Sequence, residues 1–238
     1  DDRREQTVAR GVAFLEAAQA TDGSWSSEKG PGITALATAA LLGQGRTADD
    51  PSVARGLAYL EQFVQPSGGI HHPATLYRNY ETCLAMMCFE AADRDGRYRQ
   101  IVDRAEAFVK GIQWDADEGY DESKPGYGGA GYGKHNRPDL SNTQFLLDAL
   151  HASGVEPDDP ALQRALKFVS RCQNLESQHN QTKFPKLNPD GGFYYTVAAG
   201  GSSQAGALPN GGLRSYGSMT YAGLKNMIYA GVKAEDLR

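Results

Sequence analysis

Residues 8–19 read VARGVAFLEAAQ, and a closely similar stretch, VARGLAYLEQFVQ, returns at residues 53–65. Two more copies follow, VDRAEAFVKGIQ at 102–113 and LQRALKFVSRCQ at 162–173. Each copy begins with an apolar residue, has Arg at its third position and an aromatic residue at its seventh, and ends in Gln. Apolar residues recur every three or four positions, which is typical of one face of an amphipathic helix. The sequence therefore predicts an array of helical repeats.

A glycine turn follows each of these predicted helices, which we call the A helices. The turns read DGSW (22–25), SGGI (67–70), EGY (118–120) and DGGF (190–193). Glycine suits these places because it readily adopts the left-handed conformation that ends a helix. A second, more apolar helix, the B helix, is predicted after each turn, with a threonine at equivalent positions: Thr34, Thr82, Thr143 and Thr220. Because the B helices are apolar nearly all round, we expect them in an inner layer covered by the A helices.

The repeated arginine and aromatic residue lie four positions apart on each A helix. We expect the arginine stem to pack on the ring, with a cation–π contact between them. The pairs are Arg10 and Phe14, Arg55 and Tyr59, Arg104 and Phe108, and Arg164 and Phe168.

The whole pattern resembles the α/α toroids of squalene and oxidosqualene cyclases and of protein prenyltransferase β-subunits. In that superfamily an outer helix ends in a Q-x-x-x-G-x-W or Q-x-x-x-G-G-F type of turn. The matching residues here are Gln19, Gly23 and Trp25; Gln65, Gly68 and Gly69; Gln113, Gly119 and Tyr120; and Gln173, Gly191, Gly192 and Phe193. The resemblance implies an all-α fold, an α/α toroid of helical hairpins with outer and inner helix layers.

The repeats place four hairpins at approximately 2–45, 50–95, 98–154 and 159–231, within one α/α-toroid domain spanning 1–238. Toroids of this superfamily close with more hairpins. We therefore expect either an open toroid or a chain truncated before a fifth hairpin.

The composition limits the partners that this chain can have. Its 238 residues include 24 basic and 29 acidic side chains, for a net charge of −5 without long runs of one sign. This balance argues against binding to nucleic acid or to an anionic membrane surface. No apolar stretch approaches the roughly 18 residues of a membrane span, and the opening DDRREQ is too charged for a signal peptide. The location is left open and includes an exported bacterial protein whose signal peptide has been removed.

Cysteine usage is sparse. The three cysteines, Cys83, Cys88 and Cys172, have no CxxC spacing, so the sequence predicts neither a disulfide framework nor a structural zinc site. The D-x-C element of the prenyltransferase zinc site is also missing. We expect no metal and no cofactor.

The lengths of the loops that join A to B helices, which we call rim loops, indicate where a site lies. The separations from Gln19, Gln65, Gln113 and Gln173 to the threonine of the next B helix are 15, 17, 30 and 47 residues. In a hairpin array these loops share one rim with the N-termini of the B helices. Unusually long loops are more often functional than accidental. The helix N-termini add positive potential, which suits a carboxylate or diphosphate.

The third rim loop leads into its B helix through KHNRPDLSNT, residues 134–143. Asp139 or Ser141 suits a helix cap, while His135, Arg137 and Asp139 together suit an acid, an anion clamp and an orienting carboxylate. Glu81, at the start of the second B helix, is a candidate acid or base. The candidate catalytic residues are therefore Asp139, His135 and Glu81, and the candidate substrate-binding residues are Arg137, Arg214, Tyr132, Tyr216, Ser218, Asn142 and Tyr80.

An acidic stretch, WDADEGY at 114–120, is similar to the D-x-D-D acid motif of squalene-type cyclases. Because it lies at the end of an A helix, we interpret it as a solvated acidic turn.

Three functions remain open from the sequence. The resemblance favours a protein like the terpenoid cyclases or prenyltransferases that binds a small isoprenoid-type molecule. The aromatic rim would equally serve a non-catalytic module that binds a lipid or a protein. A polysaccharide lyase or hydrolase of the α/α-toroid type could use Arg137, Arg214 and a tyrosine around a uronate. The specific reaction, the substrate and the oligomeric state are left open.

Overall fold

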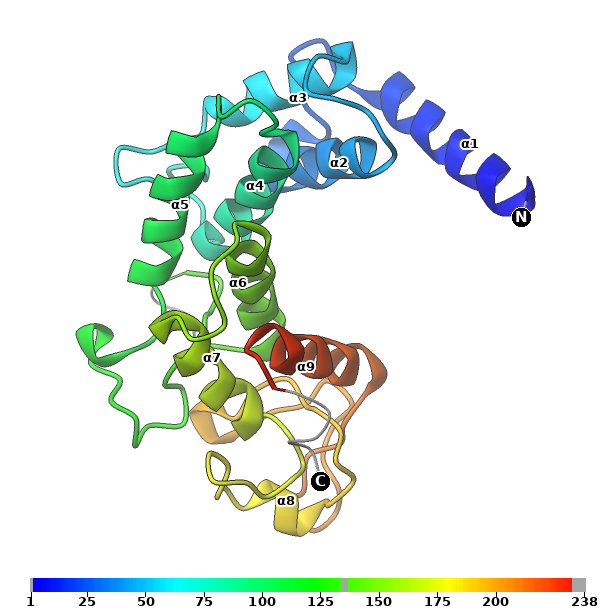
Figure 1. The fold of residues 1–238 in the computed structure, drawn as a ribbon. Coiled ribbons are helices and arrows are strands. Elements are labelled where there is room, and N and C mark those ends of the chain that lie inside the picture. Colours follow the sequence, from blue (N-terminus) through cyan, green and yellow to red (C-terminus); the bar gives the residue numbers. More distant parts are fainter. Residues whose placement is uncertain (1, 134–136, 233–238) are drawn as a thin grey trace. The chain divides into compact units, whose positions relative to one another are not determined.

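The computed structural model describes residues 2–133 and 137–232, and there the chain forms helices joined by turns and isolated β-bridges (Figure 1). The all-α prediction is confirmed. The A helices are α1 (Asp2–Ala18), α3 (Pro51–Glu61), α5 (Arg99–Gly111) and α7 (Pro160–Arg171). The B helices are α2 (Pro31–Gly43), α4 (Arg78–Ala92), α6 (Leu140–Ala152) and α9 (Gly217–Tyr229). A short helix, α8 (Phe184–Leu187), lies in the fourth rim loop.

Contacts within the chain group into two compact units, Asp1–Phe108 and Val109–Arg238. We describe each unit by itself, and the single domain stays a prediction. In the part of the chain that the structure describes, no helix is both long and apolar enough to cross a lipid bilayer.

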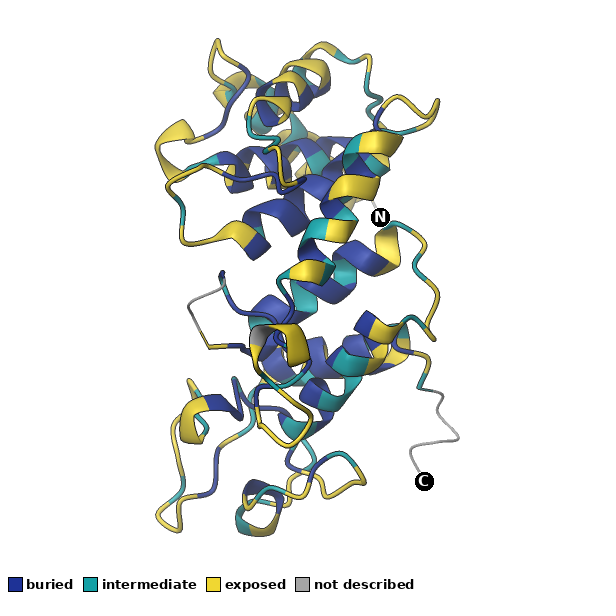
Figure 2. Cartoon of the chain, turned by 90° about the vertical axis from the view of Figure 1, so that its left-hand side faces the viewer, coloured by how far each residue is buried: buried dark blue, intermediate teal, exposed yellow. Residues whose placement is uncertain are grey.

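The B helices supply most of the core of each unit. In the first unit α2 packs against α4 and α3, and in the second α6 packs against α9 and α7. Helix α4 buries ten of its side chains, whereas α1 buries none. The cartoon in Figure 2 is coloured by the burial of each residue. Among the A helices, α7 buries one face through Leu162, Ala165, Phe168 and Val169. The amphipathic pattern of the A repeat thus corresponds to a helix that covers the B helices on one side.

One hydrogen bond recurs in all four hairpins and ties each turn to its B helix. The threonine Oγ1 accepts the backbone N–H of the turn residue that follows the glycines. The four pairs are Thr34 with Trp25 (3.0 Å), Thr82 with Ile70 (3.0 Å), Thr143 with Ala130 (2.9 Å) and Thr220 with Phe193 (3.1 Å). We call this bond the threonine clamp. Because all its atoms are buried or nearly so, leaving either group unpaired would be costly.

The clamp corrects the sequence-based assignment of the third turn. Thr143 binds Ala130, so the turn equivalent to SGGI is Gly128–Gly129–Ala130 rather than EGY at 118–120. Gln113 agrees with this register because its Nε2 donates to the Gly128 carbonyl at 2.8 Å. Gly119 instead ends a separate 3₁₀ turn, η2 (Ala116–Glu118).

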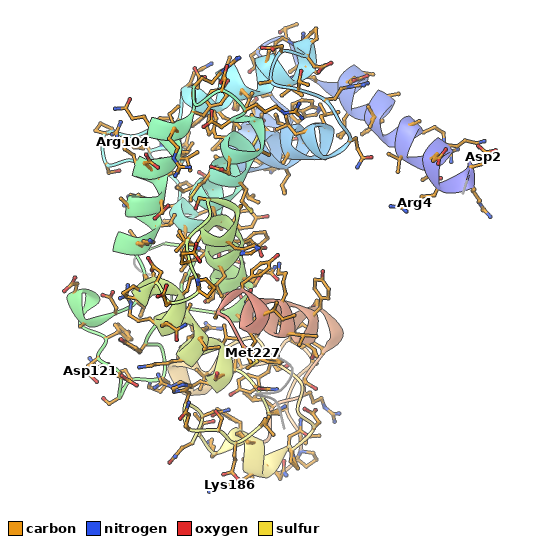
Figure 3. All side chains as sticks on the ribbon, in the orientation of Figure 1. Asp2, Arg4, Arg104, Asp121, Lys186 and Met227 are labelled. Carbon is orange, nitrogen blue, oxygen red and sulfur yellow. The ribbon has the colours of Figure 1, made fainter. Side chains whose placement is uncertain are left out.

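The repeated arginines do not make the predicted cation–π contacts among the described residues, where the recorded cations over rings are lysines. Three of them, Arg55, Arg104 and Arg164, reach back to the preceding turn. Arg55 donates to Gln19 Oε1 at 2.6 Å, and Arg164 donates to Gln113 Oε1 at 3.1 Å. Arg104, labelled in Figure 3, donates to the Pro66 carbonyl at 2.7 Å. Such charge-assisted hydrogen bonds are stronger than a contact over a ring at an exposed site, and they join one hairpin to the next.

The first glycine of a turn lies against the carbonyl of the same arginine. Gly128 has φ +83°, and a Cβ there would lie 1.9 Å from the Arg164 carbonyl oxygen. Gly23 and Gly68 meet the carbonyls of Arg55 and Arg104 in the same way. Glycine is therefore required both for the conformation and for the close approach.

Gly128→Ala should destabilise the protein far more than Gly119→Ala. Both glycines have positive φ, but nothing lies within 4 Å of a Cβ at Gly119. We expect about 1 kcal/mol lost at Gly119 from the backbone conformation alone, and about 1–3 kcal/mol more at Gly128 from overpacking. Urea denaturation of the two variants measures both losses. Equal losses would show that Gly128 does not contact α7.

Candidate functional site

The third and fourth rim loops meet at the start of α6. The backbone N–H of Leu140 donates to the Tyr195 carbonyl at 2.8 Å, and the Thr196 hydroxyl donates to the Pro138 carbonyl at 2.7 Å. Arg137, itself exposed, donates from Nη2 to the Ser202 hydroxyl at 3.2 Å. The two longest rim loops are therefore held together where candidate residues gather. The candidate acid His135 lies outside the described residues.

Asp139 is the buried centre of this junction, with 2% of its surface exposed. It caps α6, as predicted: one carboxylate oxygen accepts the Asn142 backbone N–H and the other accepts the Asn142 side-chain amide, both at 2.8 Å. The Tyr195 hydroxyl also hydrogen-bonds to the carboxylate. Burial raises the pKa of Asp139 above its usual value, and the bonds from Asn142 and Tyr195 offset part of that effect. We call Asp139, Asn142 and Tyr195 the Asp139 cluster.

Two of the predicted tyrosines lie beside the Asp139 cluster. Tyr132 is half-buried and hydrogen-bonds to Tyr195, whose pKa is raised by burial and by the charge of Asp139. Tyr216 is half-buried at the N-cap of α9, and burial together with Asp139 raises its pKa. The cluster thus gathers hydroxyl groups around one carboxyl.

The fourth-loop candidates are held differently. Arg214 is exposed, its backbone N–H donates to the Gly206 carbonyl, and its carbonyl accepts the Ser203 hydroxyl. Ser218 is exposed in the first turn of α9. Since Arg137 contacts Ser202 while Arg214 is tied through its backbone, an anion site shared by the two arginines stays a prediction.

The first unit contains a second buried carboxyl, Glu81, in the first turn of α4. Only 3% of Glu81 is exposed. Its Oε2 accepts the His72 backbone N–H and its Oε1 accepts the Thr75 hydroxyl, both at 2.9 Å. Burial raises the pKa of Glu81, and these two hydrogen bonds offset part of the rise. The predicted neighbour Tyr80 is half-buried on the same helix.

Glu81 lines a cavity of about 440 Å³ between the first and second rim loops. We call it the Glu81 pocket. It is lined by Ser27, Glu28, Lys29, Gly30, His72, Thr75, Tyr77 and Glu81.

Sequence reasoning missed several residues at these two places, although the repeat carried a signal for them. In each hairpin, one residue lies two positions after the turn residue that binds the clamp threonine. These residues are Ser27, His72, Tyr132 and Tyr195. Ser27 and His72 line the Glu81 pocket, and Tyr195 is part of the Asp139 cluster. Once the clamp fixes the register, this position marks the residues that face the rim sites.

The acidic stretch and the three cysteines make contacts that do not form a further site. Asp115, from the acidic stretch, accepts the Asp117 backbone N–H and lies 3.2 Å from Arg164, so it forms a turn and an ion pair. Cys83, Cys88 and Cys172 are free and buried, and burial raises the pKa of Cys88 to about 12. Within residues 2–133 and 137–232, no three His, Cys, Asp or Glu side chains gather into a group that could hold a metal ion.

Asp139 should make stability depend on pH in a defined direction. A carboxyl whose folded-state pKa is raised stabilises the fold fully below its unfolded pKa, near 3.9, and loses that contribution as pH rises through the folded value. Asp139→Asn removes this titration but retains a good helix cap. The melting temperature of the wild type should therefore fall relative to the variant as pH is raised from about 4. Parallel curves for the two proteins would contradict the raised pKa, and Asp117→Asn, in an exposed turn, serves as the control.

Comparison with known families agrees with the fold and includes both buried carboxyls. Residues 29–196 match the model of the squalene-hopene cyclase C-terminal domain, a span that covers most of the chain and includes Glu81 and Asp139. A search of the curated proteins finds no match. The extent of the family match, together with the helical hairpins and their glutamine–glycine turns, shows that the chain belongs to the squalene-hopene cyclase C-terminal domain family.

Proposed function

We propose that this chain binds an apolar ligand of the isoprenoid type, as a protein like the terpenoid cyclases and prenyltransferases, with Asp139 as its acid. The observation that carries the proposal is a carboxyl with 2% exposure at the junction of the two longest rim loops, in a chain of the squalene-hopene cyclase family. Burial raises the pKa of this carboxyl, so it keeps its proton to a higher pH than an exposed aspartate does, which suits a general acid. Protonation of a carbon–carbon double bond by such a group starts the cyclisation reactions that the resemblance implies.

Apolar side chains exposed on the B helices support an apolar ligand. On α9, Tyr221, Leu224 and Ile228 are 70%, 48% and 60% exposed, and their spacing places them on one helix face. In the first unit, Ile33 and Leu36 of α2 are 40% and 46% exposed. Grouped apolar residues on a surface indicate an interaction site.

A non-catalytic binding module is the second candidate, and one observation favours it. The Asp139 carboxylate receives hydrogen bonds from the Asn142 backbone, the Asn142 amide and the Tyr195 hydroxyl. Donors of this kind favour the ionised form of a carboxyl. In this alternative, Asp139 holds the rim loops together while the ligand is only bound.

The two candidates differ in what they do with a bound lipid. Native mass spectrometry of the protein purified from its own host, followed by organic extraction, should show a co-purifying isoprenoid lipid. Incubation with squalene and analysis of the extract by gas chromatography should then show a cyclised product. Asp139→Asn should still bind the lipid but lose at least about a hundredfold in turnover, as expected for a general acid.

The remaining outcomes separate the alternatives. Bound lipid without product in either protein would favour the binding module. A protein that neither carries a lipid nor binds squalene would show the proposed function to be wrong. Asp117→Asn, an acidic residue outside the Asp139 cluster, should behave as the wild type does.

A further inference from the structure

We infer that the Glu81 pocket binds the polar end of an isoprenoid-type molecule, and that this end is a neutral hydroxyl group that donates a hydrogen bond to Glu81 rather than an anionic group such as a diphosphate. This inference rests on the proposed function because it assumes an isoprenoid-type ligand. It names the class of that ligand, an isoprenoid alcohol.

The Glu81 carboxylate can accept more hydrogen bonds than the described residues donate to it. An ionised carboxylate has about four acceptor positions. Among the described residues, two groups donate to Glu81, the His72 backbone N–H and the Thr75 hydroxyl, one to each oxygen. Burial to 3% exposure removes most of the water that would otherwise donate to the carboxylate. A ligand hydroxyl that reaches the carboxylate therefore replaces solvation that burial has removed.

The Glu81 carboxylate borders open space. Glu81 lines a cavity of about 440 Å³, so a ligand in the cavity can approach it. Gly30 forms the wall nearest to Oε1, and a Cβ at that position would lie 2.9 Å from this oxygen. Gly30 also has φ +81°, so both the backbone conformation and the carboxylate disfavour a side chain there. A side chain at residue 30 would therefore press on Oε1 from the side of the first rim loop.

The charged side chains that line the Glu81 pocket disfavour an anionic ligand. Two carboxylates, Glu28 and Glu81, line it, with Lys29 and His72 as its basic side chains. Glu81 also lies in the first turn of α4, so its negative charge already occupies the positive end of that helix. An anionic group placed beside a buried carboxylate would be repelled strongly because the local dielectric is low. A neutral donor avoids this repulsion.

The second unit has a comparable arrangement at the start of α6. The Asp139 carboxylate, 2% exposed, accepts the N–H of Asn142 at the N-terminus of α6. The Asp139 side chain, in either charge state, therefore occupies the place where an anion would bind. In each unit, one B helix has its positive end paired with a buried carboxylate, which argues against a diphosphate at either place.

Three probes that share one isoprenoid tail test the inference: farnesene, farnesol and farnesyl diphosphate. Their dissociation constants are measured by isothermal titration calorimetry on the full chain. In the wild type we expect farnesol to bind about ten- to a hundredfold more tightly than farnesene, as for a hydrogen bond to a charged group, and the diphosphate to bind more weakly than farnesol. In Glu81→Gln the ratio of the farnesene to the farnesol constant should fall toward one.

The ratio serves as an internal control, because farnesene binding reports whether each variant still accepts the tail. Glu61→Gln, an exposed substitution on α3 outside the pocket, should keep the wild-type ratio. If Glu81→Gln does not fold, as judged by circular dichroism, Glu81→Asp replaces it. Aspartate keeps the charge, but its side chain is one methylene shorter and places the carboxylate farther from the pocket. The ratio of the farnesene to the farnesol dissociation constant should therefore again fall.

The contrary outcomes are distinct. Tightest binding of the diphosphate, or a ratio unchanged by substitution of Glu81, would overturn the inference while the proposed function stands. Absence of binding by all three probes would overturn the inference, and if squalene also failed to bind and no lipid co-purified, the proposed function would be overturned as well.

Discussion

The hydrogen bond between a B-helix threonine and the backbone of the preceding turn is the interaction on which the other features depend. It fixes the register of each rim loop relative to the helix that follows. With the register fixed, the first glycine of the turn lies against the next A helix, whose arginine binds the turn of the preceding hairpin. In the first three hairpins a single buried bond thus aligns a B helix, a turn and the neighbouring A helix. The residue two positions beyond the clamp is then directed to a rim site.

The rim sites are built around two carboxyls that would be costly to bury without partners. Glu81 is held by the second rim loop through His72 and Thr75, and Asp139 by its own helix and the fourth loop through Asn142 and Tyr195. In both cases burial raises the pKa although several donors are present. Long rim loops therefore do more than connect helices, because they supply the donors that make a buried carboxyl tolerable.

Local patterns in the sequence predicted most of the fold, whereas contacts between distant segments were outside their reach. Apolar spacing and the terminal glutamines placed the A helices, and the threonines placed the B helices. The third turn was misplaced because its loop contains two glycine turns, and only the bond from Thr143 to Ala130 distinguishes them. The arginines were misassigned for a related reason. Their acceptors lie far away in the sequence, beyond any helical periodicity. Gln19, for example, is 36 residues from Arg55.

Some residues of the two rim sites could be predicted from the sequence and others could not. Asp139 and Glu81 could be chosen from their positions at the starts of B helices, and both are buried. Thr75 could not be chosen, since it acts through a loop whose path the sequence does not specify, and the repeat position of Tyr195 becomes informative only once the clamp fixes the register. The position just before the clamp threonine illustrates the reason. It holds Glu81 in the second hairpin and Asn142 in the third, where Asn142 binds the carboxyl of Asp139 three residues earlier. The second and third hairpins thus each bury a carboxyl at the start of the B helix, but at different positions relative to the clamp threonine. The repeat therefore fixes the scaffold and leaves the chemistry to individual rim residues.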